Sequence, residues 1–204
     1  GTRFYLTSTG AIQRNSSGSV RGTEAIDLQT SRSAPGQVAS GNYSVIGGGR
    51  NNQASGLSSV VSGGEGNIAS GTGSQIGGGT NNTASQTGAA VGGGNGNTAS
   101  GLRSLVTGGN GNTASGQTSL VVGGSSNVAN NLSAVVTGGD NNTGSGTQSF
   151  VGSGTSNTAS GVKSVVVGGN INTASGQTSF VGSGLNNEAS GLSSAIVAGE
   201  NNRA

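Results

Sequence analysis

The best candidates for acid–base chemistry in this chain are two carboxylates that lie close to cations. Glu24 and Asp27 are three residues apart, could share one face, and lie beside three arginines. The chain has no His and no Cys, which removes most nucleophile–base pairs and the commonest zinc ligands. An isolated carboxylate pair among arginines is more typical of a salt-bridged structural cap. We therefore predict no enzymatic activity, no catalytic residue, and no metal or cofactor site.

Two short patterns could still indicate a ligand. The segment GGGNGN at 92–97 is loosely similar to a phosphate-binding loop, but no Gly-Lys-Ser/Thr follows it. The same glycines recur along the chain, so they indicate turns. A Ca²⁺-binding solenoid needs an aspartate in every coil, whereas residues 39–204 contain a single aspartate, Asp140. Neither pattern predicts a bound ion.

The composition excludes other function classes. The 204 residues include 44 glycines, three Phe, two Tyr, and no Trp or Met, and the net charge is +2. A nucleic-acid partner would require a basic stripe, which the sequence lacks. There is no apolar run long enough to span a bilayer and no signal-peptide pattern. We expect no nucleic-acid partner and no membrane insertion of this segment.

A strict 15-residue repeat dominates the sequence. Ala or Gly recurs every fifteen residues from Ala39 to Ala204, so 39–203 contains eleven repeats without an insertion. With this residue as position 1, the consensus is A-S-G-x-x-S-x-V-x-G-G-x-N-N-T. Helical repeats need more than about 30 residues, and Gly, Asn and β-branched residues are poor helix formers. We predict an all-β fold, a parallel β-solenoid of 15-residue coils over 39–204.

The segment 1–38 lies outside the repeat and is predicted to be an N-terminal cap or connector. It contains Phe4, Tyr5, Leu6 and Ile12, and an apolar stretch at 26–28. The edge of the first coil would otherwise be open to pairing with other chains. We expect these apolar residues to cover it, as the terminal repeats of solenoids usually do.

Alternation within a coil predicts which side chains face inward. Positions 6–8–10 and 14–1–3 are period-2 partners on two short strands. Glycines at positions 3, 10 and 11 are expected in tight turns, because glycine adopts a positive φ without steric cost. The eight charged residues of the repeats fall at positions 5, 12 and 15, outside or in turns. Position 8, always Val or Ile, is the predicted core: Ile46, Val61, Ile76, Val91, Val106, Val121, Val136, Val151, Val166, Val181 and Ile196.

Position 14 is asparagine in all eleven repeats. Stacked side-chain amides would form a ladder along the solenoid, whereas an asparagine that only favours a turn needs no ladder. Both interpretations remain open from the sequence. The asparagine column consists of Asn52, Asn67, Asn82, Asn97, Asn112, Asn127, Asn142, Asn157, Asn172, Asn187 and Asn202.

Position 7 is mostly apolar, although it should point away from position 8. An apolar stripe along the outside of a monomer is a patch that soluble proteins avoid. The 38 residues before the repeats are too few to cover eleven coils, so we predict self-association. The predicted interface consists of Val45, Val60, Leu105, Leu120, Val135, Phe150, Val165 and Phe180.

The repeats resemble a known family. YSVIGGG at 43–49, SSVVSGG at 58–64 and KSVVVGG at 163–169 are similar to the S-V-x-I-G repeat of the YadA-like head of trimeric autotransporter adhesins. The resemblance covers 39–204. It implies a left-handed β-roll, a homotrimer of parallel rolls, and extracellular attachment to a host-surface receptor, either glycan or protein. The sequence shows no coiled-coil stalk, neck or membrane anchor of that family, which suggests a segment of a longer protein or another architecture.

Two further resemblances bear on function. The stretch at 21–41, RGTEAIDLQTSRSAPGQVASG, resembles the lead-in to such repeats in phage tail-fibre proteins, which implies a virion fibre as an alternative to a bacterial cell surface. Thr-x-Ser pairs at positions 15 and 2 resemble the Thr-x-Thr rows of ice-binding solenoids. That row is interrupted at Gln53, Ile68, Val128, Glu188 and Arg203. We expect an attachment fibre and keep ice binding as the alternative.

Overall fold

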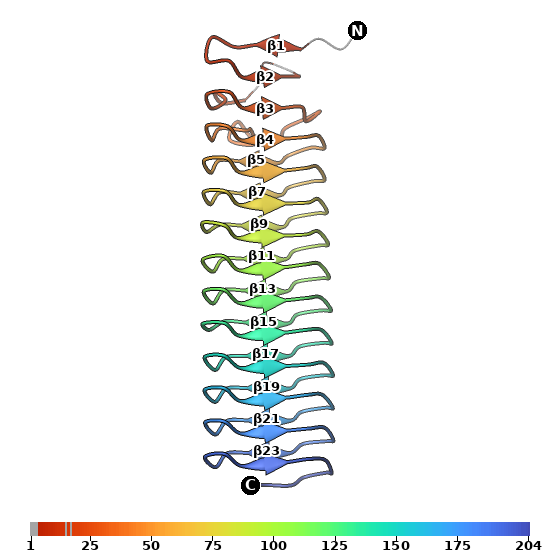
Figure 1. Ribbon diagram of the computed structural model, residues 1–204. Helices are drawn as coiled ribbons and strands as arrows, with labels where there is room; N and C mark the ends of the chain where they lie inside the picture. The colour runs from red at the N-terminus through yellow and green to blue at the C-terminus, as the bar shows by residue number, and fades with distance from the viewer. Residues whose placement is uncertain (1–3, 15, 17) are drawn as a thin grey trace. The chain divides into compact units, whose positions relative to one another are not determined.

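The computed structural model describes residues 4–14, 16 and 18–204, and every regular element among them is a β-strand. The strands are two residues long and follow one another around successive coils (Figure 1). Residues fifteen apart pair in parallel, as Val45 does with Val60. The predicted all-β parallel solenoid with 15-residue coils is therefore confirmed. The chain divides into two compact units, 1–100 and 101–204, which we describe in turn.

The first unit has two sheets. One contains, in spatial order, β1 (Tyr5–Leu6), β2 (Ile12–Gln13), β3 (Ile26–Asp27), β4 (Val45–Ile46), β6 (Val60–Val61), β8 (Gln75–Ile76) and β10 (Ala90–Val91). The other contains β5 (Gln53–Ala54), β7 (Ile68–Ala69), β9 (Thr83–Ala84) and β11 (Thr98–Ala99).

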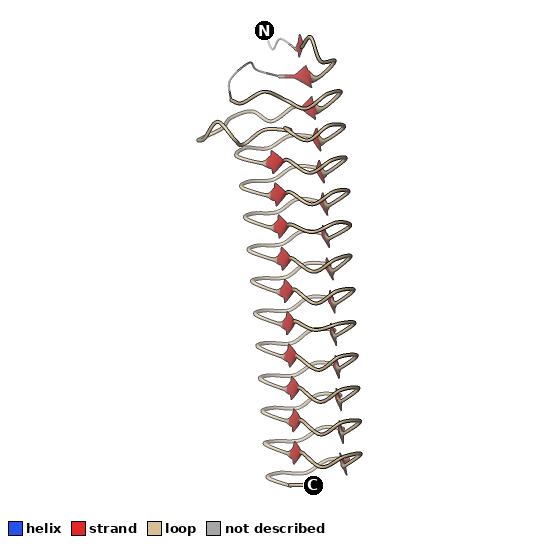
Figure 2. Cartoon of the chain, turned by 90° about the vertical axis from the view of Figure 1, so that its left-hand side faces the viewer, coloured by secondary structure: helices blue, strands red, loops and turns tan. Residues whose placement is uncertain are grey.

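The second unit repeats this arrangement. Its first sheet contains β12 (Leu105–Val106), β14 (Leu120–Val121), β16 (Val135–Val136), β18 (Phe150–Val151), β20 (Val165–Val166), β22 (Phe180–Val181) and β24 (Ala195–Ile196). Its second contains β13 (Thr113–Ala114), β15 (Val128–Ala129), β17 (Thr143–Gly144), β19 (Thr158–Ala159), β21 (Thr173–Ala174) and β23 (Glu188–Ala189). Each coil thus contributes positions 7–8 to one sheet and positions 15–1 to the other, on opposite sides of the roll (Figure 2).

The interior of each coil is narrow because small residues fill most of it. Position 1 is alanine in ten repeats, and all ten of these alanines have no exposed surface. Position 6 is Ser or Ala, and Ser44, Ser59 and Ala134 have no exposed surface. The Val or Ile at position 8 supplies the only large buried side chain of most coils. Hydrogen bonds between coils, each donated to the coil fifteen residues away, complete the stack.

The turns use left-handed backbone at positions 5, 11 and 13. In the repeat that contains Ser58, for example, φ is 53° at Ser58, 87° at Gly64 and 66° at Gly66. Position 3 does begin a turn, because the amide of Ser59 donates to the carbonyl of Gly56, but its glycine has no positive φ. That part of the prediction is wrong, and it is also wrong for position 10 apart from Gly78. Glycine at position 3 instead allows a close approach: a Cβ on Gly56 would lie 2.1 Å from the carbonyl oxygen of Gly71.

Position 13 is Asn, Gly or Ser in the other repeats, but in one repeat it is the β-branched residue Ile171. It adopts φ 57° and is half exposed, so its side chain gains little from packing. A left-handed conformation costs an L-residue roughly 1–2 kcal/mol, and Asn tolerates it better than a β-branched side chain does. We expect Ile171→Asn to raise the free energy of unfolding by about 1 kcal/mol in thermal or urea melts. Ile171→Val keeps the branch at Cβ and should leave the free energy of unfolding unchanged. An equal increase in both variants would contradict the view that Ile171 is strained.

Strands of the N-terminal segment continue the pairing of the solenoid. β2 pairs in parallel with β3, and β3 with β4, so the stack begins upstream of the boundary predicted at residue 39. The sequence separation between paired residues is not fifteen here, because Ile12 pairs with Ile26 and Ile26 pairs with Val45. The antiparallel strand β1 covers the edge of β2. Among the apolar residues predicted to cover the first coil, Phe4 is 65% and Leu6 76% exposed, whereas Ile26 and Leu28 are half buried.

Candidate functional site

The eleven position-8 side chains lie inside the roll. Ten of them are at most 1% exposed, and Ile196 is 7% exposed. In the second unit, Val121 pairs with Val136 and Val136 with Val151, so the column is continuous through neighbouring coils. At position 1, a Cβ on Gly144 would lie 3.4 Å from Cγ2 of Val136, so the two inner columns are in contact there. The column is structural and leaves no space for a ligand.

The asparagine column combines both interpretations that the sequence left open. The Nδ2 of Asn142 donates to the carbonyl of Gly138 in its own turn, at 2.9 Å, and to that of Gly154 in the next coil, at 2.7 Å. Its Oδ1 accepts the backbone amide of Asn157 at 2.9 Å. The side chain therefore holds a turn and links two coils. The column is buried from Asn52 to Asn187, whereas Asn202 is exposed.

Replacing Asn142 with leucine tests this column. The carbonyl of Gly138 and the amide of Asn157 would lose their buried partner, whereas the carbonyl of Gly154 still accepts the amide of Asp140. Each unsatisfied group costs about 1–3 kcal/mol. We expect the free energy of unfolding to fall by roughly 3 kcal/mol or more in urea titrations. Asn141→Ser is the matched control, because Asn141 is exposed and serine occupies the same position at Ser156. Similar losses in both variants would contradict the role of the buried amide.

The outer face of the first sheet carries the predicted interface residues. Leu105 is 37% exposed, and the other seven are half buried between their neighbours along the sheet. At position 9 of the same face, Val122 is 42% and Val167 47% exposed. The hydroxyls of Thr107 and Thr137 donate to position-9 carbonyls of the following coil. Their hydroxyl hydrogens are thus used within the sheet, and this face of the second unit is largely apolar.

The opposite sheet presents a polar face. Thr143, Thr158 and Thr173 occupy position 15 in three strands that pair in register. Serines at position 2 follow them two residues later in the sequence. Farther along, Glu188 and Arg203 form an exposed ion pair at 3.3 Å. The two faces of the second unit therefore differ: the first sheet is apolar outside, and the second displays hydroxyls and charges.

A buried ionic cluster occupies the interior of the N-terminal coils. Asp27 takes the place of a position-8 residue, since it pairs with Ile46, and it is fully buried. Arg21 Nε lies 3.0 Å and Arg32 Nη2 2.7 Å from its two carboxylate oxygens. Burial lowers the pKa of the Arg21 guanidinium, an effect that Asp27 opposes and Arg32 adds to. The predicted salt-bridged cap is confirmed for Asp27, whereas Glu24 is exposed and lies outside the cluster.

Gln29 begins the buried amide column. Its Oε1 accepts the backbone amide of Asn52 at 2.8 Å, as asparagine Oδ1 does in later coils. Its Nε2 donates to the carbonyls of Gln37 and Asn52, at 2.8 and 3.0 Å. Sequence reasoning missed this residue because it lies 23 residues before Asn52 and outside the 15-residue register.

No family model and no curated protein matches this chain.

The described residues also contain no cluster of three potential metal ligands. No helix long and apolar enough to cross a bilayer occurs in the part of the chain that the structure covers. Asp27, the carboxylate nearest to a catalytic arrangement, is fully buried and forms ion pairs with the guanidiniums of Arg21 and Arg32.

Proposed function

We propose that this chain is a non-enzymatic segment of a trimeric attachment fibre. In this proposal, three left-handed β-rolls associate in parallel and form part of a phage tail fibre or a surface adhesin outside the cell. The observation that carries it is the contrast between the two faces of the second unit, because the apolar face suits burial against other copies. The resemblance of 43–49, 58–64 and 163–169 to the YadA-like head repeat supports the same assembly.

The internal structure suits a spacer. Each coil is held to its neighbours by parallel backbone hydrogen bonds and by the core and asparagine columns. Such a stack resists lateral opening because each coil depends on both of its neighbours. A fibre that carries a binding element away from a surface needs this property.

Light scattering on the purified 204-residue chain tests the assembly. We expect about three times the 19.2 kDa chain mass at micromolar concentration. A folded monomer under these conditions would refute the trimer. A bacterial adhesin head remains the alternative within the same class, and the sequences that flank this segment in the full gene would distinguish it from a phage fibre.

Ice binding is the second candidate, supported by the in-register threonines of β17, β19 and β21. The row is short, because Val128 and Glu188 replace threonine on either side of it. The attachment proposal predicts no thermal hysteresis and no ice-crystal shaping at millimolar concentration. Clear hysteresis that is lost in Thr158→Leu would favour ice binding.

A further inference from the structure

A hollow lies between the N-terminal segment and the first repeat. Its volume is about 440 Å³, and it is lined by Phe4, Arg14, Leu28, Thr30 and Gly47–Gly49. This volume is within the range of small-ligand pockets. All of these residues belong to the first unit, and the solenoid core uses none of their side chains.

The walls combine one cation with apolar surface. Arg14 is the only charged residue among the described residues that line the hollow, and its side chain is partly exposed. Its guanidinium is in none of the four ion pairs among the described residues. Phe4 is 65% exposed beside it, and Leu28 is half buried. A planar cation, an aromatic ring and an aliphatic side chain thus meet at one opening.

Three of the lining residues, Gly47–Gly49, form a glycine turn. The amides of Gly47 and Arg50 donate to the next coil, at 3.0 Å each. Gly48 and Gly49 lie between them, and neither amide has an acceptor among the described residues. A Cβ on Gly48 would meet nothing within 4 Å, so the backbone there is open.

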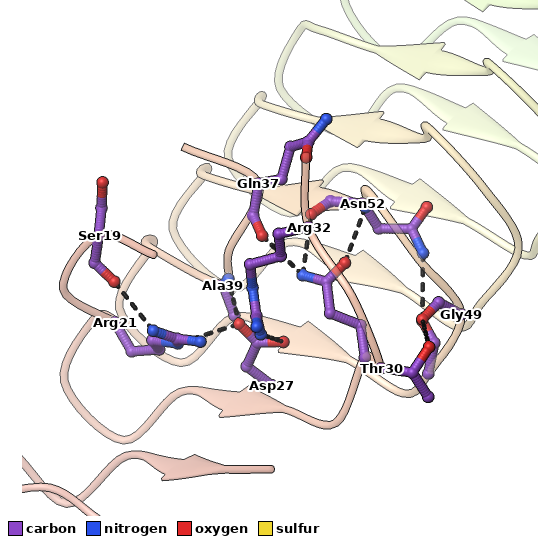
Figure 3. A network of polar contacts seen from close by, with 11 residues as sticks. Ser19, Arg21, Asp27, Thr30, Arg32, Gln37, Ala39, Gly49 and Asn52 are labelled. Carbon is purple, nitrogen blue, oxygen red and sulfur yellow. Dashed lines mark hydrogen bonds and ion pairs between the residues drawn. The ribbon is translucent and has the colours of Figure 1, made fainter. Parts of the chain in front are cut away.

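Thr30 holds this turn in place. Its backbone amide donates to the carbonyl of Gly49 at 2.8 Å, and its hydroxyl donates to the same oxygen at 3.0 Å (Figure 3). Because the hydroxyl hydrogen is already used, the Oγ lone pairs remain available as acceptors. The lining therefore includes two amides without an acceptor among the described residues, and one hydroxyl oxygen that can still accept a hydrogen bond.

We propose that this hollow binds a carboxylate-bearing sugar of a host-surface glycan. The Arg14 guanidinium would pair with the carboxylate, for which its planar fork is suited. Phe4 and Leu28 would pack against the apolar C–H face of the sugar ring, and the Gly48 and Gly49 amides and Thr30 Oγ would bind its polar groups. The proposal rests on the attachment function and names the class of receptor. A polyanion such as nucleic acid fits less well, because one arginine cannot neutralise several phosphates.

Calorimetry with the full 204-residue chain tests the ligand class. The probes are N-acetylneuraminic acid and glucuronic acid, with their methyl esters and glucose as neutral controls. We expect saturable binding of at least one acid and binding of its ester at least about tenfold weaker, because the ester loses the charge-assisted hydrogen bonds. The proposal would be overturned if neither acid bound saturably up to about 10 mM, or if an acid and its ester bound equally well.

Two variants locate the site. Arg14→Gln and Phe4→Ala should each weaken binding by about tenfold, whereas Arg103→Gln, an exposed cation of the second unit, should not. Thermal melts should match the wild type for Arg14→Gln, since its side chain contributes no ion pair. Unchanged binding in Arg14→Gln would refute the site. Light scattering on the same samples distinguishes the two proposals. If the chain is a trimer but binds no acid, the fibre proposal stands and the acidic-sugar proposal is refuted.

Discussion

Val136→Asp should unfold the coils around it, whereas Val135→Asp should leave them folded. Val136 is fully buried and packs between Val121 and Val151 in the core column. An aspartate there would have no salt-bridge partner among the described residues, and an uncompensated buried charge costs about 3–5 kcal/mol. We expect a large loss of the strand signal in circular dichroism at a temperature where the wild type is folded.

Val135 is the matched control because it is the adjacent residue on the same strand with the opposite orientation. It is half buried on the outer face, where a carboxylate keeps part of its hydration. Val135→Asp should lower the stability of the chain by about 1 kcal/mol or less and should lower its mass in light scattering. If both variants melt alike and keep the wild-type mass, the assignment of inner and outer columns fails.

The repeat itself is what made most of the fold predictable. A 15-residue period with invariant columns specifies parallel stacking, and the alternation around position 8 specifies which side faces inward. The prediction that position 8 faces inward is confirmed at Val121, Val136 and Val151, because alternate residues of a β-strand point to the same face and that face is buried. The asparagine column was visible as a pattern, but its geometry was not. Two of the three hydrogen bonds of Asn142 depend on the distance between its turn and the next coil.

The left-handed positions show where a sequence pattern is insufficient. Position 11 is always glycine, and its positive φ follows from the residue type. Positions 5 and 13 also have positive φ, yet they accept residues as different as Arg103, Thr118 and Ile171. The hydrogen bonds of the turns impose this backbone, as when the amide of Thr118 donates to the carbonyl of Leu102. Tertiary contacts therefore override the local preference of the side chain.

The N-terminal coils lie outside the register, which is why their roles could not be predicted. Asp27 and Gln13 occupy the interior column in which the repeats place Val or Ile. Two arginines from separate turns make the buried Asp27 acceptable, and Gln29 replaces an asparagine from a different sequence distance. The hollow beside Arg14 arises in the same way. It requires the N-terminal segment to pass over the Gly47–Gly49 turn, which no spacing in the sequence indicates.

Deletion of one whole coil should cost far less stability than deletion of one residue. Removing 129–143 joins Val128 to Gly144 and restores each column: Val121 can pair with Val151, and Asn127 can bond to Asn157. Since each coil contacts only its neighbours, we expect a folded protein whose melting temperature falls by a few degrees, about 2–4 °C for each kcal/mol lost.

Removing Thr137 alone shifts Gly139, at φ 86°, and Asn142 out of their positions. The strands that follow must then stretch, or turn their inward residues outward. Circular dichroism melts of the two deletions measure the difference. A whole-coil deletion that melts well below the Thr137 deletion would show that the coils are not interchangeable units.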